Sequence, residues 1–305
     1  MVSLSDIKGF FRGTILLDEP LSKYTWMRVG GAADYYVEPA DRNDLIKIAK
    51  YFRQNNFPFF ILGRGSNVLV SDEGIRGAVI NLEAALSGLK IERNRVIAEA
   101  GIWLQKFVDF CIQHELAGVE MLAGIPGTVG GAIVMNAGAH GGEISDHVVD
   151  VEIFRGCETA LITKSNADFS YRHSAFDRDI VLSASFELPK GEKEELAKRR
   201  RELIMKRNET QPLELPNSGS MFKNPKNTFA ARLIEQAGLK GKKIGSAQIS
   251  EKHSNFIVNL GEAKATDIVQ LLELARRTVY QNSGIELELE VRLFGFPQKT
   301  LGQIV

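Results

Sequence analysis

The spacing of apolar residues predicts a small unit of strands with one helix in residues 1–83. Short apolar runs predict four strands, at residues 33–37, 58–62, 68–70 and 78–82. Between the first two strands, apolar residues recur at the spacing of one helix face, at Leu45, Ile48, Ala49 and Phe52. Asp41 or Asn43 suits the N-cap of this helix, because a side-chain oxygen there accepts a bond from a free backbone amide.

Residues 84–195 are predicted to form a larger unit in which strands predominate. A hairpin is predicted around the turn Arg93-Asn94, with its two strands at 89–92 and 96–99. Residues 103–114 have the apolar spacing of a helix. Further strand-like runs follow at 148–154, 161–163 and 180–188.

Residues 196–305 are predicted to form a third unit. A charged helix at 192–207, which lacks a strong apolar stripe, is expected to link the second unit to it. Within it we expect helices at 229–237 and 267–281, the second capped by Thr266, and a strand at 255–259. At 285–294 leucine and valine alternate with charged residues, which predicts a strand with one buried face.

The composition excludes several classes of protein. The 305 residues carry 38 Lys+Arg against 38 Asp+Glu, so the zero net charge gives no electrostatic reason to expect a nucleic-acid partner. Two cysteines are too few for a disulfide scaffold or a zinc cluster, and the five histidines lack metal-ligand spacing. The first residues contain no apolar run of signal-peptide length, so we expect a cytoplasmic protein.

The stretch 121–142 contains no charged residue, and its length alone suggests a membrane helix. Seven of its 22 residues are glycine, however, and glycine is a poor helix former. We therefore expect no membrane span. Loop and helix backbone that approaches a ligand is the favoured interpretation.

A first glycine-rich loop lies between two predicted strands and contains Gly63, Arg64, Gly65, Ser66 and Asn67. Glycines in such a loop allow backbone amides to converge on a phosphate. The loop does not have the GxGxxG pattern of a Rossmann fold, and the chain contains no GxxxxGK[ST] phosphate loop. The alternative interpretation is a tight turn without a ligand.

A second glycine-rich loop contains Gly124, Ile125, Pro126, Gly127, Thr128, Gly130 and Gly131. It is expected to open a short helix whose N-terminal amides face a pyrophosphate. The alternative is close helix packing without a ligand. Two such loops in adjacent units favour one long anionic ligand, and a dinucleotide fits better than a single phosphate.

Three polar residues in separate segments are candidates for chemistry. Ser220 lies in a polar loop, but no GxSxG pattern surrounds it, so a hydrolase triad is not supported. Arg172 suits bidentate binding of a carboxylate, although most isolated arginines only form surface pairs. Glu290 lies in a run rich in glutamate and, taken alone, is interpreted as a solvated side chain.

The combination of motifs closely resembles the MurB family, the UDP-N-acetylenolpyruvoylglucosamine reductases of bacterial peptidoglycan synthesis. The resemblance extends from about Thr25 to Gly295. Its segments, in chain order, are 25–31 (TWMRVGG), 62–69 (LGRGSNVL), 124–131 (GIPGTVGG), 171–174 (YRHS), 219–225 (GSMFKNP), 237–241 (AGLKG), 253–256 (HSNF) and 290–292 (EVR).

The resemblance implies an α+β fold with two FAD-binding subdomains of the vanillyl-alcohol-oxidase or PCMH type, followed by a substrate-binding domain. We divide the chain accordingly at 1–83, 84–195 and 196–305. Both glycine-rich loops and Arg28 are then assigned to FAD. The FAD is expected to be non-covalent, because nothing marks His140 or another residue as a linkage site.

The implied reaction uses NADPH to reduce the flavin, which then passes hydride to the vinyl carbon of UDP-N-acetylglucosamine enolpyruvate. A proton is added at the carbon bearing the carboxylate, and UDP-N-acetylmuramate results. By resemblance, Arg172 and a protonated Glu290 stabilise the enolate, and Ser220 is the general acid. Tyr171, Asn224 and His253 match positions near the substrate.

The chain resembles the shorter, type II branch of the family, because residues 173–219 contain no counterpart of the extra tyrosine segment of the longer branch. The basic helix Lys198–Arg207, or the loop near Gln211, is a hypothesis for covering the substrate diphosphate. We expect a monomer with no membrane partner. Two alternatives remain open: a flavoprotein oxidase of the same superfamily, and a non-catalytic protein that binds nucleotide sugars.

Overall fold

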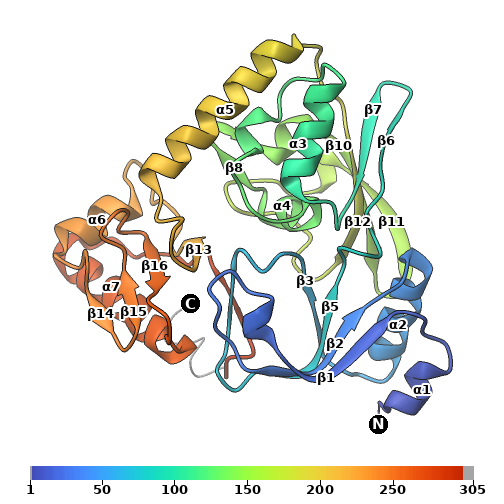
Figure 1. Ribbon diagram of the computed structural model, residues 1–305, viewed down its shortest axis with the longest axis horizontal. Coiled ribbons are helices and arrows are strands. Elements are labelled where there is room, and N and C mark those ends of the chain that lie inside the picture. Colours follow the sequence, from blue (N-terminus) through green and yellow to red (C-terminus); the bar gives the residue numbers. More distant parts are fainter. Residues whose placement is uncertain (1, 298–305) are drawn as a thin grey trace. The chain divides into compact units, whose positions relative to one another are not determined.

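The computed structural model describes residues 2–297, and its backbone contacts divide the chain into two compact units that alternate along the sequence (Figure 1). Unit 1 comprises Met1–Leu17, Tyr35–Gly63 and Gly77–Arg207. Unit 2 comprises Asp18–Asp34, Arg64–Arg76 and Asn208–Val305. The division into three domains at residues 83 and 195 stays a prediction. Residues 1 and 298–305, which belong to the first and third predicted domains, lie outside the described residues.

The first sheet of unit 1 has the strand order β1-β2-β5-β3. Its strands are β1 (Thr14–Pro20), β2 (Ala32–Glu38), β5 (Ile75–Asn81) and β3 (Phe59–Leu62), and parts of the first three are counted with unit 2. Strands β3 and β5 are parallel, which requires the crossover through β4 after β3. Helix α1 (Leu4–Lys8) precedes this sheet.

Helix α2 (Arg42–Gln54) confirms the first helix that the sequence predicts. It buries the predicted apolar face, Leu45, Ile48, Ala49 and Phe52. Asp41 is its N-cap, and the Asp41 side chain accepts a bond from Asp44 N. Asn43 therefore lies within the helix and not at its cap.

A five-stranded antiparallel sheet forms the rest of unit 1, in the order β11-β10-β12-β7-β6. The strands are β11 (Glu158–Thr163), β10 (Val148–Arg155), β12 (Ile180–Phe186), β7 (Arg95–Glu99) and β6 (Leu89–Glu92). The predicted hairpin is confirmed by the pairing of β6 with β7. Every residue of the central strand β12 is buried, as expected for a strand with neighbours on both edges.

Helices α3 (Leu104–Gln113) and α4 (Val129–Met135) pack on this second sheet and contribute to its core (Figure 1). Phe107 of α3 and Phe186 of β12 pack with ring centroids 4.7 Å apart. The remaining connections contain 3-10 turns and one short hairpin: η2 (Glu120–Leu122), β8 (Gly138–Ala139), β9 (Gly142–Glu143), η3 (Ile144–His147) and η4 (Lys164–Asn166). The stretch 121–142 thus contains a seven-residue helix between loops.

Unit 2 contains a four-stranded sheet in the order β13-β16-β15-β14. Its strands are β13 (Asn217–Ser220), β16 (Phe256–Asn259), β15 (Ala247–Ile249) and β14 (Lys243–Ile244). Helix α7 (Ala265–Ser283) packs on it and α6 (Ala230–Gln236) packs on α7, and the apolar residues of both helices contribute to a second core. The 3-10 turn η1 (Leu21–Lys23) and a parallel pair, β4 (Val68–Val70) with β17 (Arg292–Phe294), complete the unit.

Two sequence predictions for unit 2 are wrong in detail. Helix α7 has Lys264 and not Thr266 as its N-cap. Asp72 accepts bonds from the amides of Ala265 (2.7 Å) and Thr266 (2.9 Å), so a residue far away in sequence satisfies the free amides of this helix.

The strand predicted at 285–294 is regular only at Arg292–Phe294, because its partner β4 contributes only three residues to the ladder. The predicted alternation still holds for burial: the side chains of Leu287 and Val291 are buried.

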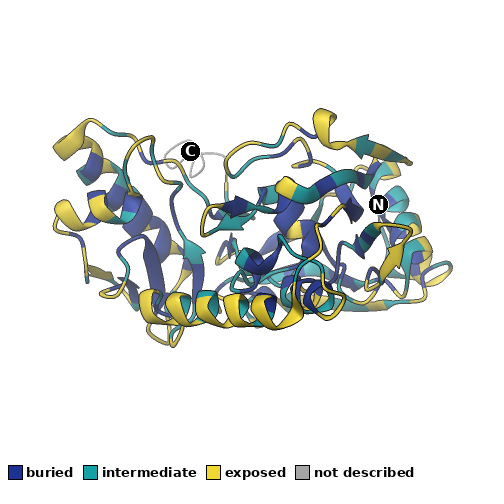
Figure 2. Ribbon diagram, turned by 90° about the horizontal axis from the view of Figure 1, so that it is seen from above, coloured by how far each residue is buried: buried dark blue, intermediate teal, exposed yellow. Residues whose placement is uncertain are grey.

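Helix α5 (Lys193–Thr210) is mostly exposed, and among its residues only Leu196 is buried (Figure 2). This agrees with a charged helix without a strong apolar stripe. None of the helices in residues 2–297 is both long enough and apolar enough to cross a membrane.

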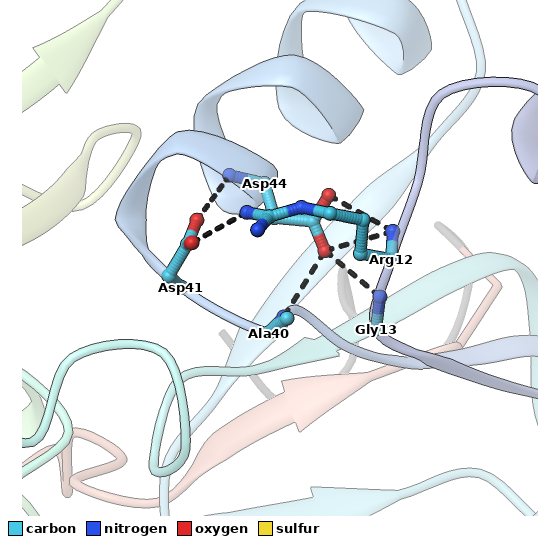
Figure 3. A network of polar contacts seen from close by, with 5 residues as sticks. All are labelled: Arg12, Gly13, Ala40, Asp41 and Asp44. Atoms are coloured by element: carbon cyan, nitrogen blue, oxygen red, sulfur yellow. Dashed lines mark hydrogen bonds and ion pairs between the residues drawn. The ribbon is translucent and has the colours of Figure 1, made fainter.

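A buried carboxylate ties the N-terminal segment of unit 1 to α2 (Figure 3). Asp44 is fully buried and accepts bonds from the amides of Arg12 (3.1 Å), Gly13 (2.9 Å) and Ala40 (3.1 Å). Asp41 pairs with the Arg12 guanidinium, and the bond from Asp44 N together with that cation lowers the pKa of the Asp41 carboxyl.

Replacing Asp44 with alanine is expected to destabilise the protein by about 2–3 kcal/mol, because three backbone amides lose a charged acceptor. Urea unfolding followed by circular dichroism measures this loss. Asp34→Ala is the control, since Asp34 pairs with the exposed Arg76 and should cost less than about 1 kcal/mol. Equal effects of the two substitutions would show that Asp44 has no special role.

Candidate functional site

Gly63 and Thr128 bring the two glycine-rich loops together within unit 1. A Cβ on Gly63 would lie 2.6 Å from Thr128 Oγ1, which is closer than real Cβ atoms approach. Thr128 also forms a β-bridge with Trp103, the residue that precedes α3. The first loop therefore begins with a residue whose Cβ would displace the Thr128 side chain of the second loop.

Some backbone amides near Thr128 donate hydrogen bonds within the protein, and others do not. The first three amides of α4 donate to protein acceptors, at Ile102 O (2.8 Å), Ala100 O (2.9 Å) and Thr128 Oγ1 (3.3 Å). By contrast, the amides of Gly127 and Thr128 donate to no acceptor among residues 2–297. The open donors of this segment therefore lie just before the helix, whereas the sequence predicted them at the first amides of the helix itself.

Asn81 and Glu83 form hydrogen bonds beside the contact between Gly63 and Thr128. Neither of these two residues was identified from the sequence. Asn81 Nδ2 donates to Gly63 O (3.3 Å), and Asn81 Oδ1 accepts from Glu83 N (2.9 Å). The Glu83 carboxylate accepts the indole N–H of Trp103. Their position in the sequence could have indicated this role, because they lie at the end of the buried strand β5, and ligand-binding loops lie at the ends of such strands.

The other four residues of the first loop belong to unit 2, where they pack against the segment 25–31. Gly65 has φ +61°, and a Cβ on it would overlap the carbonyl oxygen of Tyr24, so glycine is required twice over. Trp26 N donates to Gly65 O (3.0 Å), and the Arg64 guanidinium lies 5.9 Å from the centroid of the Trp26 ring. Within the described chain, the amides of Gly65 and Asn67 donate to no acceptor.

Arg172 lies at the centre of a tight turn in unit 1. Ser170 and His173 exchange backbone bonds of 3.2 and 3.0 Å across this turn, and Arg172 has φ +55°. Its guanidinium donates to Gly138 O (2.8 Å) and lies 4.9 Å from the centroid of the Tyr171 ring. The Tyr171 side chain is 44% exposed, which leaves it able to contact a ligand.

Positive charge gathers around the β8–β9 hairpin of unit 1. A Cβ on Gly124 would lie 2.8 Å from the Arg207 side chain, so the end of α5 packs against the second glycine-rich loop. Burial lowers the pKa of Arg207 to about 10. Burial, followed by the charges of Lys206 and Arg207, lowers the pKa of His140.

Ser220 and Glu290 lie on neighbouring segments of unit 2. Met221, which follows Ser220, accepts a bond from Glu290 N (2.9 Å) and donates to Asn255 O (2.8 Å). Asn67 Nδ2 donates to Glu290 O (3.0 Å), so a predicted cofactor residue adjoins two predicted catalytic ones.

Ser220 is half-buried at the end of β13. The preceding residue, Gly219, has φ +73°, and a Cβ on it would meet none of the described atoms within 4 Å. The backbone next to Ser220 is therefore open at Gly219.

The remaining predicted residues lie in unit 2. Arg28 is exposed, with φ +56°. Asn224 Oδ1 accepts from Ala230 N (3.1 Å), which gives it a structural role at the start of α6. His253 Nδ1 is buried without a hydrogen-bond partner in residues 2–297, and burial lowers the pKa of His253, so the neutral form is favoured.

The structure thus groups the predicted residues within each unit. Unit 1 contains Gly63, the second loop and Arg172, and unit 2 contains Arg64–Asn67 with Ser220 and Glu290. The grouping of Arg172 with Ser220 and Glu290 stays a prediction.

Comparisons with known proteins identify two family domains along the chain. Residues 33–162 match the family described as FAD binding domain, and residues 211–294 match the C-terminal domain of UDP-N-acetylenolpyruvoylglucosamine reductase. The UDP-N-acetylenolpyruvoylglucosamine reductase of Chloroherpeton thalassium is 46% identical over 307 residues, covering 98% of this chain and 99% of that protein. The protein of that name from Caldanaerobacter subterraneus is 44% identical over 286 residues, covering 93% of this chain and 94% of that protein.

The same similarity is found among solved structures. The crystal structure of UDP-N-acetylenolpyruvylglucosamine reductase (MurB) from Thermus caldophilus superposes with a TM-score of 0.78 at 35% identity. The match covers 93% of this chain and all of the other. The predicted fold class, an FAD-binding fold of the PCMH type with a C-terminal α+β domain, is confirmed.

The residues of the glycine-rich loops fit FAD. Open amides at Gly127 and Thr128 are the donors that a pyrophosphate needs, and they require no positive side chain. Gly63 and Gly65 let backbone approach where a side chain would intrude. The FAD-binding domain that the predictions assigned to these loops is therefore supported by the donor set as well as by similarity.

Gly63→Ala is expected to weaken FAD binding by roughly tenfold or more, because the added methyl group overpacks against Thr128 at a cost of about 1–3 kcal/mol. Flavin release and rebinding, followed by absorbance and fluorescence, give the dissociation constant. Gly9→Ala is the matched control, since a Cβ on Gly9 would lie 3.3 Å from Asp6 O, away from both loops. Unchanged FAD affinity in Gly63→Ala would separate this packing contact from the cofactor site.

Proposed function

The chain belongs to the UDP-N-acetylenolpyruvoylglucosamine reductase family, and from this we propose that it reduces UDP-N-acetylglucosamine enolpyruvate to UDP-N-acetylmuramate with NADPH and bound FAD. One structural observation carries the proposal. In unit 2, Ser220 and Glu290 lie on segments joined through Met221, and Asn67 of the cofactor loop bonds to the Glu290 carbonyl. The segments of Ser220 and Glu290, to which we assign the proton donor and the acid, thus adjoin Asn67 within one compact unit.

FAD, when bound, accepts hydride from NADPH and supplies it to the vinyl carbon of the substrate. The chain's own residues then have two tasks. Negative charge moves into the substrate carboxylate during the reaction, and the Arg172 guanidinium and a protonated Glu290 are assigned to stabilise it. Ser220 is assigned to donate a proton to the carbon that bears this carboxylate.

Several observations support these roles. The fixed turn around Arg172 and its bond to Gly138 O hold the guanidinium on a rigid element, as stabilisation of developing charge requires. Ser220 is only half-buried, and the backbone at the preceding Gly219 is open. An unassisted serine is a weak acid, so the polar segment around Glu290 is the source of the assistance that we propose.

We also propose the subsite for the substrate diphosphate. Lys206 and Arg207 at the end of α5 are assigned to it, because they place positive charge beside His140 in a chain that resembles the short, type II branch. Tyr171, Asn224 and His253 are assigned to the rest of the substrate. The enzyme is proposed to work in the cytoplasm as a monomer, where both nucleotide substrates are available.

The decisive test is NADPH oxidation by the purified protein with and without UDP-N-acetylglucosamine enolpyruvate. The yellow protein should bleach with NADPH and recover its colour when the enolpyruvyl substrate is added without oxygen. A protein that stays colourless after reconstitution with FAD would overturn the proposal. A yellow protein that is inert with NADPH would instead indicate a binding protein, and one that oxidises alcohols or sugars would indicate an oxidase.

Ser220→Ala is expected to leave flavin reduction by NADPH nearly intact, because no proton from Ser220 is needed there. Flavin reoxidation by the enolpyruvyl substrate should slow by roughly 10²-fold or more, the usual contribution of a general acid. Stopped-flow absorbance separates the two half-reactions. Ser165→Ala, at an exposed position, is the control, and normal reoxidation in Ser220→Ala would remove Ser220 from the mechanism.

Arg172→Lys is expected to impair substrate reduction severely, because a point charge does not reproduce the planar fork that binds a carboxylate through two bonds. The same stopped-flow measurement applies, with a steady-state KM for the substrate. Arg178→Lys tests the same change at an exposed arginine. Near-normal turnover of Arg172→Lys would assign Arg172 to the surface and not to catalysis.

A further inference from the structure

Asn136 ends α4 in a conformation that few residues adopt. It is fully buried, and its φ of +42° and ψ of +55° are left-handed. Its side-chain Oδ1 accepts from Ser145 N (3.3 Å), while Nδ2 donates to Glu143 Oε2 (2.7 Å) and to Ser170 O (2.9 Å). Two acceptors face the nitrogen and one donor faces the oxygen, so the orientation of the amide is fixed.

The bond to Ser170 O holds the turn that carries Arg172. The backbone bonds between Ser170 and His173 close this turn around Arg172, whose own left-handed φ of +55° is costly for a residue with a side chain. Such a conformation persists only where the surroundings hold it. On the far side of the turn, Ser174 Oγ donates to Val134 O (2.8 Å), so both ends of the turn are tied to the end of α4.

The guanidinium of Arg172 is fixed from the same place. It donates to Gly138 O (2.8 Å), and Gly138 follows Asn136 by two residues. A Cβ on Gly138 would lie 2.9 Å from the side chain of Glu143, which is itself an acceptor for Asn136. The backbone of the turn and the carbonyl that aligns its arginine therefore depend on one buried amide.

We infer that Asn136 is a positioning residue for Arg172, fixing the turn 170–173 and the Gly138 carbonyl so that the guanidinium has one orientation toward the substrate carboxylate. This inference rests on the proposed role of Arg172. It adds that α4 connects cofactor binding with the positioning of Arg172. The second glycine-rich loop lies at the N-terminus of this helix, and Asn136 lies at its C-terminus. Sequence reasoning had no signal for this role, since the partners of Asn136 are set by the fold.

The substitution Asn136→Asp tests the inference, because aspartate keeps the shape and tolerates the left-handed conformation. It replaces the donor with a second acceptor facing Ser170 O and Glu143. FAD content and the rate of flavin reduction by NADPH should stay within about twofold of the original protein. Flavin reoxidation by the enolpyruvyl substrate should slow by roughly 10- to 100-fold with a raised substrate KM, since small misplacements of a catalytic group have effects of this size.

A double-substitution cycle distinguishes positioning from a general structural effect. In the Arg172→Lys protein, adding Asn136→Asp should slow reoxidation by less than about threefold, because the two residues act through one group. Asn56→Asp is the control, since Asn56 is an exposed asparagine that also has a left-handed φ, +50°. If Asn136→Asp does not accumulate as folded protein, Asn136→Gly replaces it in the same measurements of FAD content, flavin reduction and flavin reoxidation. Glycine keeps the backbone conformation and removes all three side-chain bonds.

Three outcomes would overturn the inference: normal reoxidation in Asn136→Asp while Arg172→Lys is impaired, additive effects in the double variant, and loss of folded protein in both Asn136 variants. A different result, normal reoxidation in Arg172→Lys itself, would instead overturn the proposed role of Arg172. The two failures are therefore distinguishable.

Discussion

The close packing of Gly63 against Thr128 is the constraint on which the cofactor side of unit 1 depends. It joins the end of strand β3 to the loop before α4, and the second sheet packs on that helix. A side chain at position 63 would displace the side chain of Thr128, and among residues 2–297 the amides of Gly127 and Thr128 remain open as donors. A phosphate can then be held by backbone donors alone, which explains how a protein without net charge binds a dinucleotide.

Buried amide side chains hold the polar residues in place in both units. Asn81 braces Gly63, and Asn136 braces the turn of Arg172. In unit 2, the buried Asn255 exchanges two bonds with the backbone of Phe222 (3.0 and 2.8 Å), and the half-buried Asn67 bonds to Glu290 O. An amide suits this task because it donates and accepts at fixed angles without the cost of burying a charge.

The sequence predicted most of the regular elements because their signals are local. Helix α2 was predicted with its buried face and with Asp41 as one of two candidate caps, and the β6–β7 hairpin with its turn, since each needs only a few consecutive residues. The cap of α7 was wrong because Asp72, distant in sequence, satisfies its amides. The strand at 285–294 was too long because its length is set by the partner β4 and not by its own alternation.

By itself the sequence determined the family, and with it the fold class, FAD and the candidate residues Arg172, Ser220 and Glu290, because these are carried by short motifs of fixed composition. Only the tertiary structure decided which backbone amides stay open, which residues brace the loops, and that Asn136 holds the turn of Arg172. The physical reason is that hydrogen-bond partners far apart in the chain are chosen by packing. A local pattern of residue types therefore cannot predict these partners.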